Sequence, residues 1–257
     1  MIHLAVFVLA AFISTLGVGG GVFYVPIFLG FGLSFHQATT ASLLIIAITG
    51  LSAASVYHRE GLVDWRLALM LDPVKDVGAL IGGLYAGLFS ERLLSLLFAA
   101  VLVGGSVLMI RQKDDEALGA EDSSSGWRRR VGGEAYSVNL IVVLPCCLAV
   151  GLLSGLLGIG GGIFMIPLMV VAMRAPMKVA VATSAFMVCL TGTFGFIGGA
   201  MAGQFIPSTG LLLAFAGFLG AQVGPRIMVR LDKDRLRQVF IVFLYIVAAL
   251  MVYRGIA

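Results

Sequence analysis

The sequence predicts an all-α integral membrane protein made of two inverted repeats, each a broken re-entrant helical hairpin followed by three transmembrane helices. The chain of 257 residues is 60% hydrophobic and only 12% charged, whereas about 25% of the residues of a soluble domain are charged. Several apolar runs approach the ~20 residues that cross a bilayer core. An apolar element with three consecutive glycines occurs twice, as LGVGGGVFYVP at residues 16–26 and LGIGGGIFMIP at residues 157–167.

The glycine element is part of a longer repeat. Its copies stand 141 residues apart, and at an offset of 142 Gly78 and Gly82 match Gly220 and Gly224. This pattern indicates an old duplication. We expect a first transmembrane repeat at 1–111, a cytoplasmic linker at 112–138 and a second transmembrane repeat at 139–257. The linker is charged and rich in Ser and Gly, which is typical of a flexible surface segment.

The apolar segments follow one order in each half: a broken segment, then three unbroken ones. We expect these segments at 2–33, 37–57, 65–89 and 91–111, and again at 139–173, 178–201, 207–230 and 235–253.

The distribution of Lys and Arg favours re-entrant hairpins over full spans. If each broken segment crosses the membrane, eight basic residues lie on each side and no bias results. If each returns to its starting side, the second half is inverted, and fourteen basic residues lie inside against two outside, Arg92 and Arg254. The positive-inside rule therefore predicts six spans, two re-entrant hairpins and both termini outside. Arg226 is the weak point, because it could lie within its helix and snorkel.

The glycine tips are the first candidate binding site. Residues Ile2–Leu16 make about 22 Å of helix, which brings the glycines near the midplane. The N–H groups that open the resumed half-helix lack internal partners and attract anions. Small-residue packing is the competing interpretation, but it does not explain three glycines followed by proline. The candidate substrate-binding residues are Gly19, Gly20, Gly21, Val22, Gly160, Gly161, Gly162 and Ile163.

Hydroxyl side chains open the helix after each hairpin. Thr40-Ala41-Ser42 in the first half corresponds to Ala182-Thr183-Ser184 in the second, and the hydroxyl residues are Thr40, Ser42, Thr183 and Ser184. They could donate hydrogen bonds to an oxyanion, or they could cap helix starts and bond to the preceding turn. Both interpretations stay open.

A charged cluster interrupts the third apolar segment of the first half. Asp72, Lys75 and Asp76 lie where the second half has the uncharged sequence LLLAFAGF. Charges within a span indicate function by default, so Lys75 could attract an anion and an aspartate could carry a coupling proton. A self-neutralising cluster is the alternative.

Other function classes find little support. No nucleophile–base pair, metal-ligand spacing or cofactor motif is evident, so we expect neither an enzyme nor a cofactor. Basic residues cluster in loops without interleaved aromatics, which argues against nucleic acid as a partner.

The paired LGxGGGxxxxP elements, the Thr-Ser helix starts and the two-half layout resemble the TauE/SafE family of sulfite exporters. The resemblance implies export of sulfite, organosulfonates or related sulfur oxyanions across the bacterial inner membrane. By position, the resemblance implies that the two glycine elements and the four hydroxyl residues are site residues. Asp72–Asp76 departs from the family pattern.

These arguments predict a secondary transporter that holds a sulfur oxyanion between two opposed glycine-rich half-helix N-termini. An anion channel, a transporter of another small anion or a cation, and a membrane enzyme or accessory protein of a larger complex remain alternatives. The small-residue faces are compatible with a homodimer.

Overall fold

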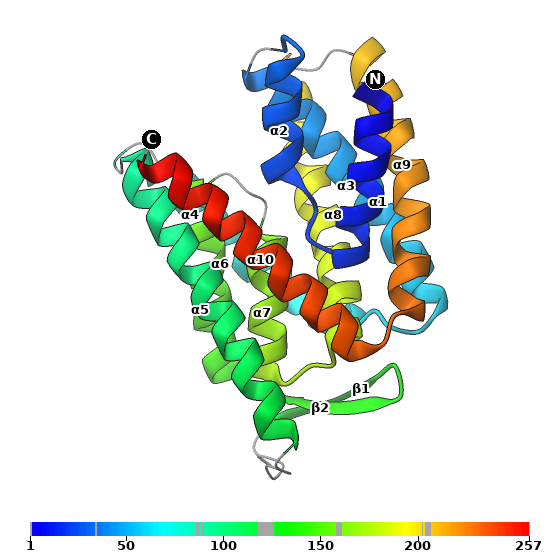
Figure 1. Ribbon diagram of the computed structural model, residues 1–257, viewed down its shortest axis with the longest axis vertical. Coiled ribbons are helices and arrows are strands. Elements are labelled where there is room, and N and C mark those ends of the chain that lie inside the picture. Colours follow the sequence, from blue (N-terminus) through cyan, green and yellow to red (C-terminus); the bar gives the residue numbers. More distant parts are fainter. Residues whose placement is uncertain are drawn as a thin grey trace. The chain divides into compact units, whose positions relative to one another are not determined.

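The computed structural model describes residues 2–256 except 34, 86, 87, 89, 118–125, 158–160, 202 and 204–206. Its described elements are almost all helical (Figure 1). They are α1 (Ile2–Leu16), α2 (Gly21–Gly30), α3 (Phe35–Arg59), α4 (Trp65–Tyr85), α5 (Glu91–Ala117), β1 (Trp127–Val131), β2 (Glu134–Val138), α6 (Leu140–Leu157), α7 (Gly162–Met173), α8 (Met177–Met201), α9 (Pro207–Arg230) and α10 (Lys233–Ile256).

Two compact units divide the chain, and each draws on both halves of the sequence. Unit 1 contains Met1–Asp72 and Val181–Leu231, and unit 2 contains Pro73–Ala180 and Asp232–Ala257. The long helices α4 and α8 therefore each contribute residues to both units. These units group residues by their contacts, whereas the repeats group them by sequence similarity. The units therefore do not test the repeat boundaries, which stay a prediction.

Each glycine element breaks an apolar segment into two helices. In unit 1, α1 runs away from the N-terminus and α2 runs back (Figure 1). In unit 2, α6 follows directly on β2, and α7 contacts both α6 and β2, so α7 returns to the end where α6 begins. In each unit, the two helices beside the glycine element form a hairpin, and its re-entry into the bilayer stays a prediction.

Corresponding glycines perform the same packing task in the two units. In unit 1, Gly220 of α9 meets Phe7 and Gly224 meets Ala11, so α1 and α9 run parallel in close contact. In unit 2, α4 and α6 are also parallel, with Gly78 on Leu148 and Gly155 on Ala79. Small residues let helix backbones approach closely in a membrane. In both cases, a helix from one half packs on a helix from the other.

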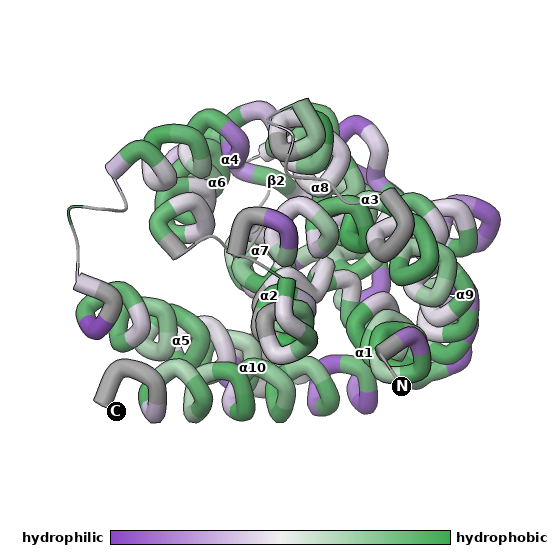
Figure 2. Tube along the Cα trace, turned by 90° about the horizontal axis from the view of Figure 1, so that it is seen from above, coloured by the Kyte–Doolittle hydropathy of each residue, from purple (hydrophilic) through white to green (hydrophobic). Residues whose placement is uncertain are grey.

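Five described helices are long and apolar enough to cross a bilayer: Gln37–Arg59, Arg92–Arg111, Met177–Gly198, Gly210–Arg230 and Lys233–Tyr253. Hydrophobic residues run along most of α5 and α10 (Figure 2), and many large side chains such as Tyr253 and Leu250 are exposed. Such exposure fits contact with lipid rather than water.

The sixth expected span, α4, has the required length but falls outside this set. Its 21 residues include Arg66 and the cluster from Asp72 to Asp76. The charges lower its hydropathy, so its crossing of the bilayer remains a prediction.

The expected linker contains regular structure that the sequence interpretation missed. β1 and β2 form an antiparallel hairpin in which Trp127 pairs with Val138 and Val131 with Glu134. The turn at Gly132 and Gly133 has positive φ at both residues, as short hairpin loops require. In addition, the guanidinium of Arg129 stacks 4.5 Å from the centre of the Trp127 ring. Apolar helical periodicity could not indicate such a short polar hairpin.

Candidate functional site

The first glycine tip has a backbone that only glycine adopts easily. Gly17, Gly19 and Gly20 have φ values of 67°, 90° and 75°, a left-handed region that is costly for other residues. The carbonyl of Gly20 accepts hydrogen bonds from the N–H groups of Phe23 and Tyr24 at 3.0 and 3.1 Å. Gly20 thus closes the N-terminus of α2, while Gly21 and Val22 form its first turn.

Apolar side chains enclose the first tip. A Cβ on Gly20 would lie 2.6 Å from Cδ1 of Ile13 and 2.9 Å from Cε2 of Tyr24, and a Cβ on Gly19 would collide with Val188. A small cavity beside the tip includes the hydroxyl-bearing residues Ser14 and Thr49 in its lining.

One hydroxyl of the second half, that of Ser184, lies at the tip of the first half. Ser184 Oγ donates a hydrogen bond of 3.0 Å to the carbonyl of Gly17, and Thr183 Oγ1 accepts one of 3.1 Å from the N–H of Asp64. Both side chains are fully buried within unit 1. Ser184 therefore links α8 to the first glycine tip, whereas Thr183 links α8 to Asp64, just before α4.

Two buried hydroxyls of unit 1 have no hydrogen-bond partner among the described atoms: Ser42 Oγ and Tyr24 Oη. Leaving a buried polar group without a hydrogen bond is costly. Ser42 and its neighbour Thr40 are each 1% exposed on α3. Tyr24 was missed from sequence. The sequence did contain a signal for it: Tyr24 places a phenol hydroxyl in an apolar half-helix, and the equivalent position of the second glycine element is Met165.

The second glycine tip repeats the backbone of the first. Gly160 lies outside the described residues, but Gly161 caps α7 with φ 75° and ψ −20°. Its carbonyl accepts hydrogen bonds from the N–H groups of Phe164 and Met165 at 3.2 and 3.1 Å. Gly162 and Ile163 form the buried first turn of α7. The two tips therefore have equivalent caps.

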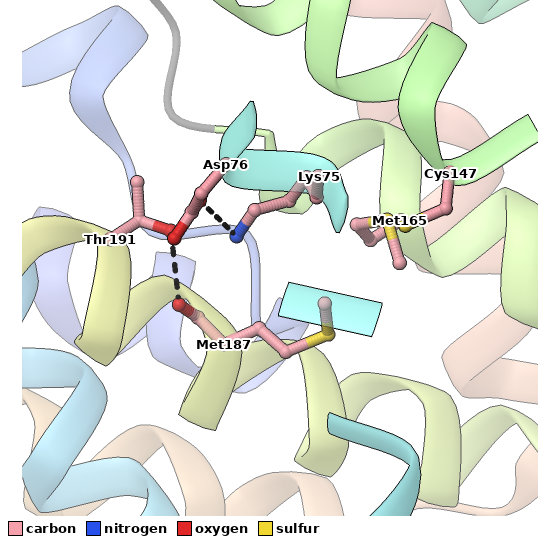
Figure 3. A network of polar contacts seen from close by, with 6 residues as sticks. All are labelled: Lys75, Asp76, Cys147, Met165, Met187 and Thr191. Atoms are coloured by element: carbon pink, nitrogen blue, oxygen red, sulfur yellow. Dashed lines mark hydrogen bonds and ion pairs between the residues drawn. The ribbon is translucent and has the colours of Figure 1, made fainter. Parts of the chain in front are cut away.

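The surroundings of the second tip are polar and charged. A Cβ on Gly161 would lie 3.2 Å from Oγ of Ser154 and 3.3 Å from Cδ of Lys75, all within unit 2. Lys75 is 2% exposed and its Nζ lies 3.3 Å from Oδ1 of Asp76 (Figure 3). The buried side chain of Lys75 thus packs beside the N-terminus of α7, which carries a partial positive charge. Asp76, whose side chain is 33% exposed, offsets part of the charge of Lys75.

Packing holds Lys75 and α7 in these positions. Gly151 of α6 directly contacts the backbone of Lys75. In addition, the ring of Phe98 on α5 packs edge-on against Phe164 of α7, with 5.0 Å between the ring centroids. Asp72, three residues before Lys75 on α4, is 3% exposed. Sequence reasoning singled out the charged cluster but could not place Lys75 beside the second glycine element, and it missed Ser154.

Comparison with known proteins decides the class of this chain. The family model described as Sulfite exporter TauE/SafE matches residues 2–251. The chain belongs to the TauE/SafE family. It is 29% identical over 254 residues to the probable membrane transporter protein YunE of Bacillus subtilis, covering 95% of this chain and 93% of the relative.

Other relatives agree with this assignment. A probable membrane transporter protein of Haemophilus influenzae is 27% identical, with 96% of each chain covered. Sulfite exporter TauE/SafE family protein 5 of Arabidopsis thaliana is 34% identical over 40% of this chain and 24% of its own. No solved structure matches. This TauE/SafE protein is a multi-pass membrane transporter and not an enzyme, as the sequence predicted.

Proposed function

We propose that this TauE/SafE protein is a secondary transporter that exports sulfite or a small organosulfonate across the bacterial inner membrane. The anion is held between the two glycine-rich half-helix N-termini, which inverted repeats would oppose near the midplane. The observation that carries the proposal is the burial of Lys75 against Gly161 at the cap of α7.

The chemistry of the second tip favours an oxyanion. Backbone N–H groups at the start of α7, the ammonium of Lys75 and the hydroxyl of Ser154 are all hydrogen-bond donors. Sulfite and sulfonates present three oxygens to such a donor set. An anion bound there would compensate the like charges that Lys75 and the helix N-terminus bring together.

The first tip contributes differently under this proposal. Its donors are the N–H groups at the start of α2 and the unsatisfied hydroxyls of Tyr24 and Ser42. Lys75 has no counterpart there, because Gly217 occupies the corresponding position. Asp76, partly exposed and paired with Lys75, is the proposed carrier of a coupling proton.

Calorimetry on the purified detergent-solubilised protein tests the substrate class. Sulfite, sulfate and two- and three-carbon sulfonates are titrated, with chloride as the control anion. We expect saturable binding of a sulfur oxyanion and none of chloride. Saturable binding of a small cation, with no response to any sulfur oxyanion, would contradict the proposal.

Cysteine labelling tests the proposed inverted topology. Glu134→Cys on β2 and Lys233→Cys at the start of α10 both change exposed residues. We expect a membrane-impermeant maleimide to label both only from the cytoplasmic side, with the native protein as the control for its own three cysteines. Labelling of the two sites from opposite sides of the membrane would contradict the inverted topology.

A further inference from the structure

A groove with basic side chains lies in unit 1, away from the glycine tips. It runs between the C-terminal halves of α3 and α9, as two adjoining hollows of about 300 and 340 Å³. Contacts of Thr49 with Gly217 and of Ser52 with Gln222 show that the two helices run parallel. Both spans end in arginine, at Arg59 and Arg230, so the groove opens at the depth where a bilayer core gives way to headgroups.

A ladder of hydrogen bonds builds the floor of the groove. Arg226 donates from Nη1 to the carbonyl of Gln222 at 3.0 Å and from Nη2 to its Oε1 at 3.1 Å. Gln222 Nε2 then donates to Ser52 Oγ at 2.6 Å, and Ser52 donates to the carbonyl of Phe218 at 3.4 Å. This ladder holds the guanidinium of Arg226 in a defined orientation on the exposed side of α9.

The charge of the groove is positive. Arg59, Arg226 and Arg230 contribute three guanidinium groups, and Glu60 contributes one carboxylate. Among the described side chains, Arg59 and Arg230 make no ion pair within 4 Å with that carboxylate. Two net positive charges therefore face a hollow that is large enough for a phosphate group.

The wall of the groove on the membrane side is apolar and open. Leu51 and Phe218 line it and are 62% and 40% exposed, and Ile227 nearby on α9 is 48% exposed. A free inorganic anion gains nothing from contact with an apolar wall, whereas an acyl chain buries apolar surface against it. Charge at one end and exposed apolar surface at the other fit an amphipathic anion.

We propose that this groove binds an anionic phospholipid, with its phosphate on Arg59, Arg226 and Arg230 and its acyl chain along Leu51 and Phe218. Guanidinium groups pair with phosphate oxygens through two N–H groups at once. The site is independent of the glycine tips and of the transported substrate. It would tie the α3–α9 pair to an acidic leaflet.

Native mass spectrometry of the detergent-solubilised protein with added phosphatidylglycerol or phosphatidylcholine tests this site. We expect preferential retention of phosphatidylglycerol, and a roughly tenfold or greater loss of that retention in Arg226→Gln, as the loss of charge-assisted hydrogen bonds predicts. Arg59→Gln should act in the same direction. The matched control is Arg235→Gln, an exposed arginine of α10 that does not line the groove, and its retention should equal that of the native protein.

Three results would overturn the proposal. Equal retention of the two lipids excludes recognition of the headgroup charge, and an equal loss in Arg235→Gln reduces the effect to general surface charge. Displacement of the lipid by millimolar inorganic phosphate, with no dependence on acyl chains, assigns the groove to a free anion. Arg226→Lys separates folding from binding, because it keeps the charge without the bidentate geometry. With its melting temperature unchanged, it should retain an intermediate amount of lipid.

Discussion

The tip at Gly17–Gly20 is surrounded by Ile13, Tyr24 and Val188, whereas Gly161 is met by the hydroxyl of Ser154 and the buried stem of Lys75. The caps themselves are alike, since Gly20 and Gly161 both have φ 75° and both accept the N–H groups of the third and fourth residues that follow. The two tips thus share one cap conformation, while the side chains around them differ.

The difference indicates that one half-helix N-terminus is held mainly by packing and a hydrogen bond, whereas the other lies beside a charged residue. At the first tip, Ser184 from α8 donates to the carbonyl of Gly17, and the nearest side chains are apolar. At the second tip, the buried side chain of Lys75 packs on Gly161, and its ammonium group pairs with Asp76. We infer that the second tip supplies most of the electrostatic attraction for an anion, because buried charges interact more strongly than dipoles alone.

Alanine at each cap glycine gives the largest expected contrast in stability. Both substitutions place a Cβ at φ 75° and cost about 1–2 kcal/mol for that reason. Gly20→Ala also forces a Cβ to within 2.6 Å of Ile13, which adds about 1 kcal/mol or more. Melting temperatures in detergent should therefore fall further for Gly20→Ala. An equal fall in melting temperature for the two variants would mean that Ile13 and Tyr24 move aside at little cost.

Removal of one hydroxyl at each tip gives a smaller effect that differs in kind. Ser184→Ala deletes the bond to Gly17 and should cost about 1 kcal/mol of stability. Ser154→Ala should instead weaken oxyanion binding severalfold with little change in melting temperature. Thermal melts and calorimetry on both variants measure this, with the native protein as the reference. A binding loss confined to Ser184→Ala would reverse the proposed roles.

Much of the local structure could be predicted from the sequence. The break between Leu16 and Gly21 follows from three glycines in an apolar run, and the ends of α3 and α9 at Arg59 and Arg230 follow from charge. Arg226 does lie within its helix, as the snorkelling alternative allowed, and it turns to Gln222. These features depend on residues that are close in sequence, where glycine conformation and hydropathy suffice.

The remaining features depend on packing between distant segments. Spacing along α4 could not reveal that Lys75 lies against Gly161, because the contact depends on the glycine-mediated approach of α4 and α6. For the same reason, the sequence could not indicate that Ser184 would bond to the tip of the other half. Tyr24 was passed over because its ring is apolar and fits the hydrophobic pattern of α2, although its hydroxyl is unsatisfied.

The central claim is that Lys75 and the N-terminus of α7 form an anion site, and Lys75→Gln tests it most directly. We would measure sulfite uptake into liposomes and sulfite binding by calorimetry for Lys75→Gln, for Lys75→Arg and for the control Lys233→Gln, which changes an exposed lysine. The account predicts at least a tenfold loss of affinity, or about 1.4 kcal/mol, in Lys75→Gln, partial retention in Lys75→Arg and no change in the control. Native affinity and flux in a folded Lys75→Gln protein would contradict it.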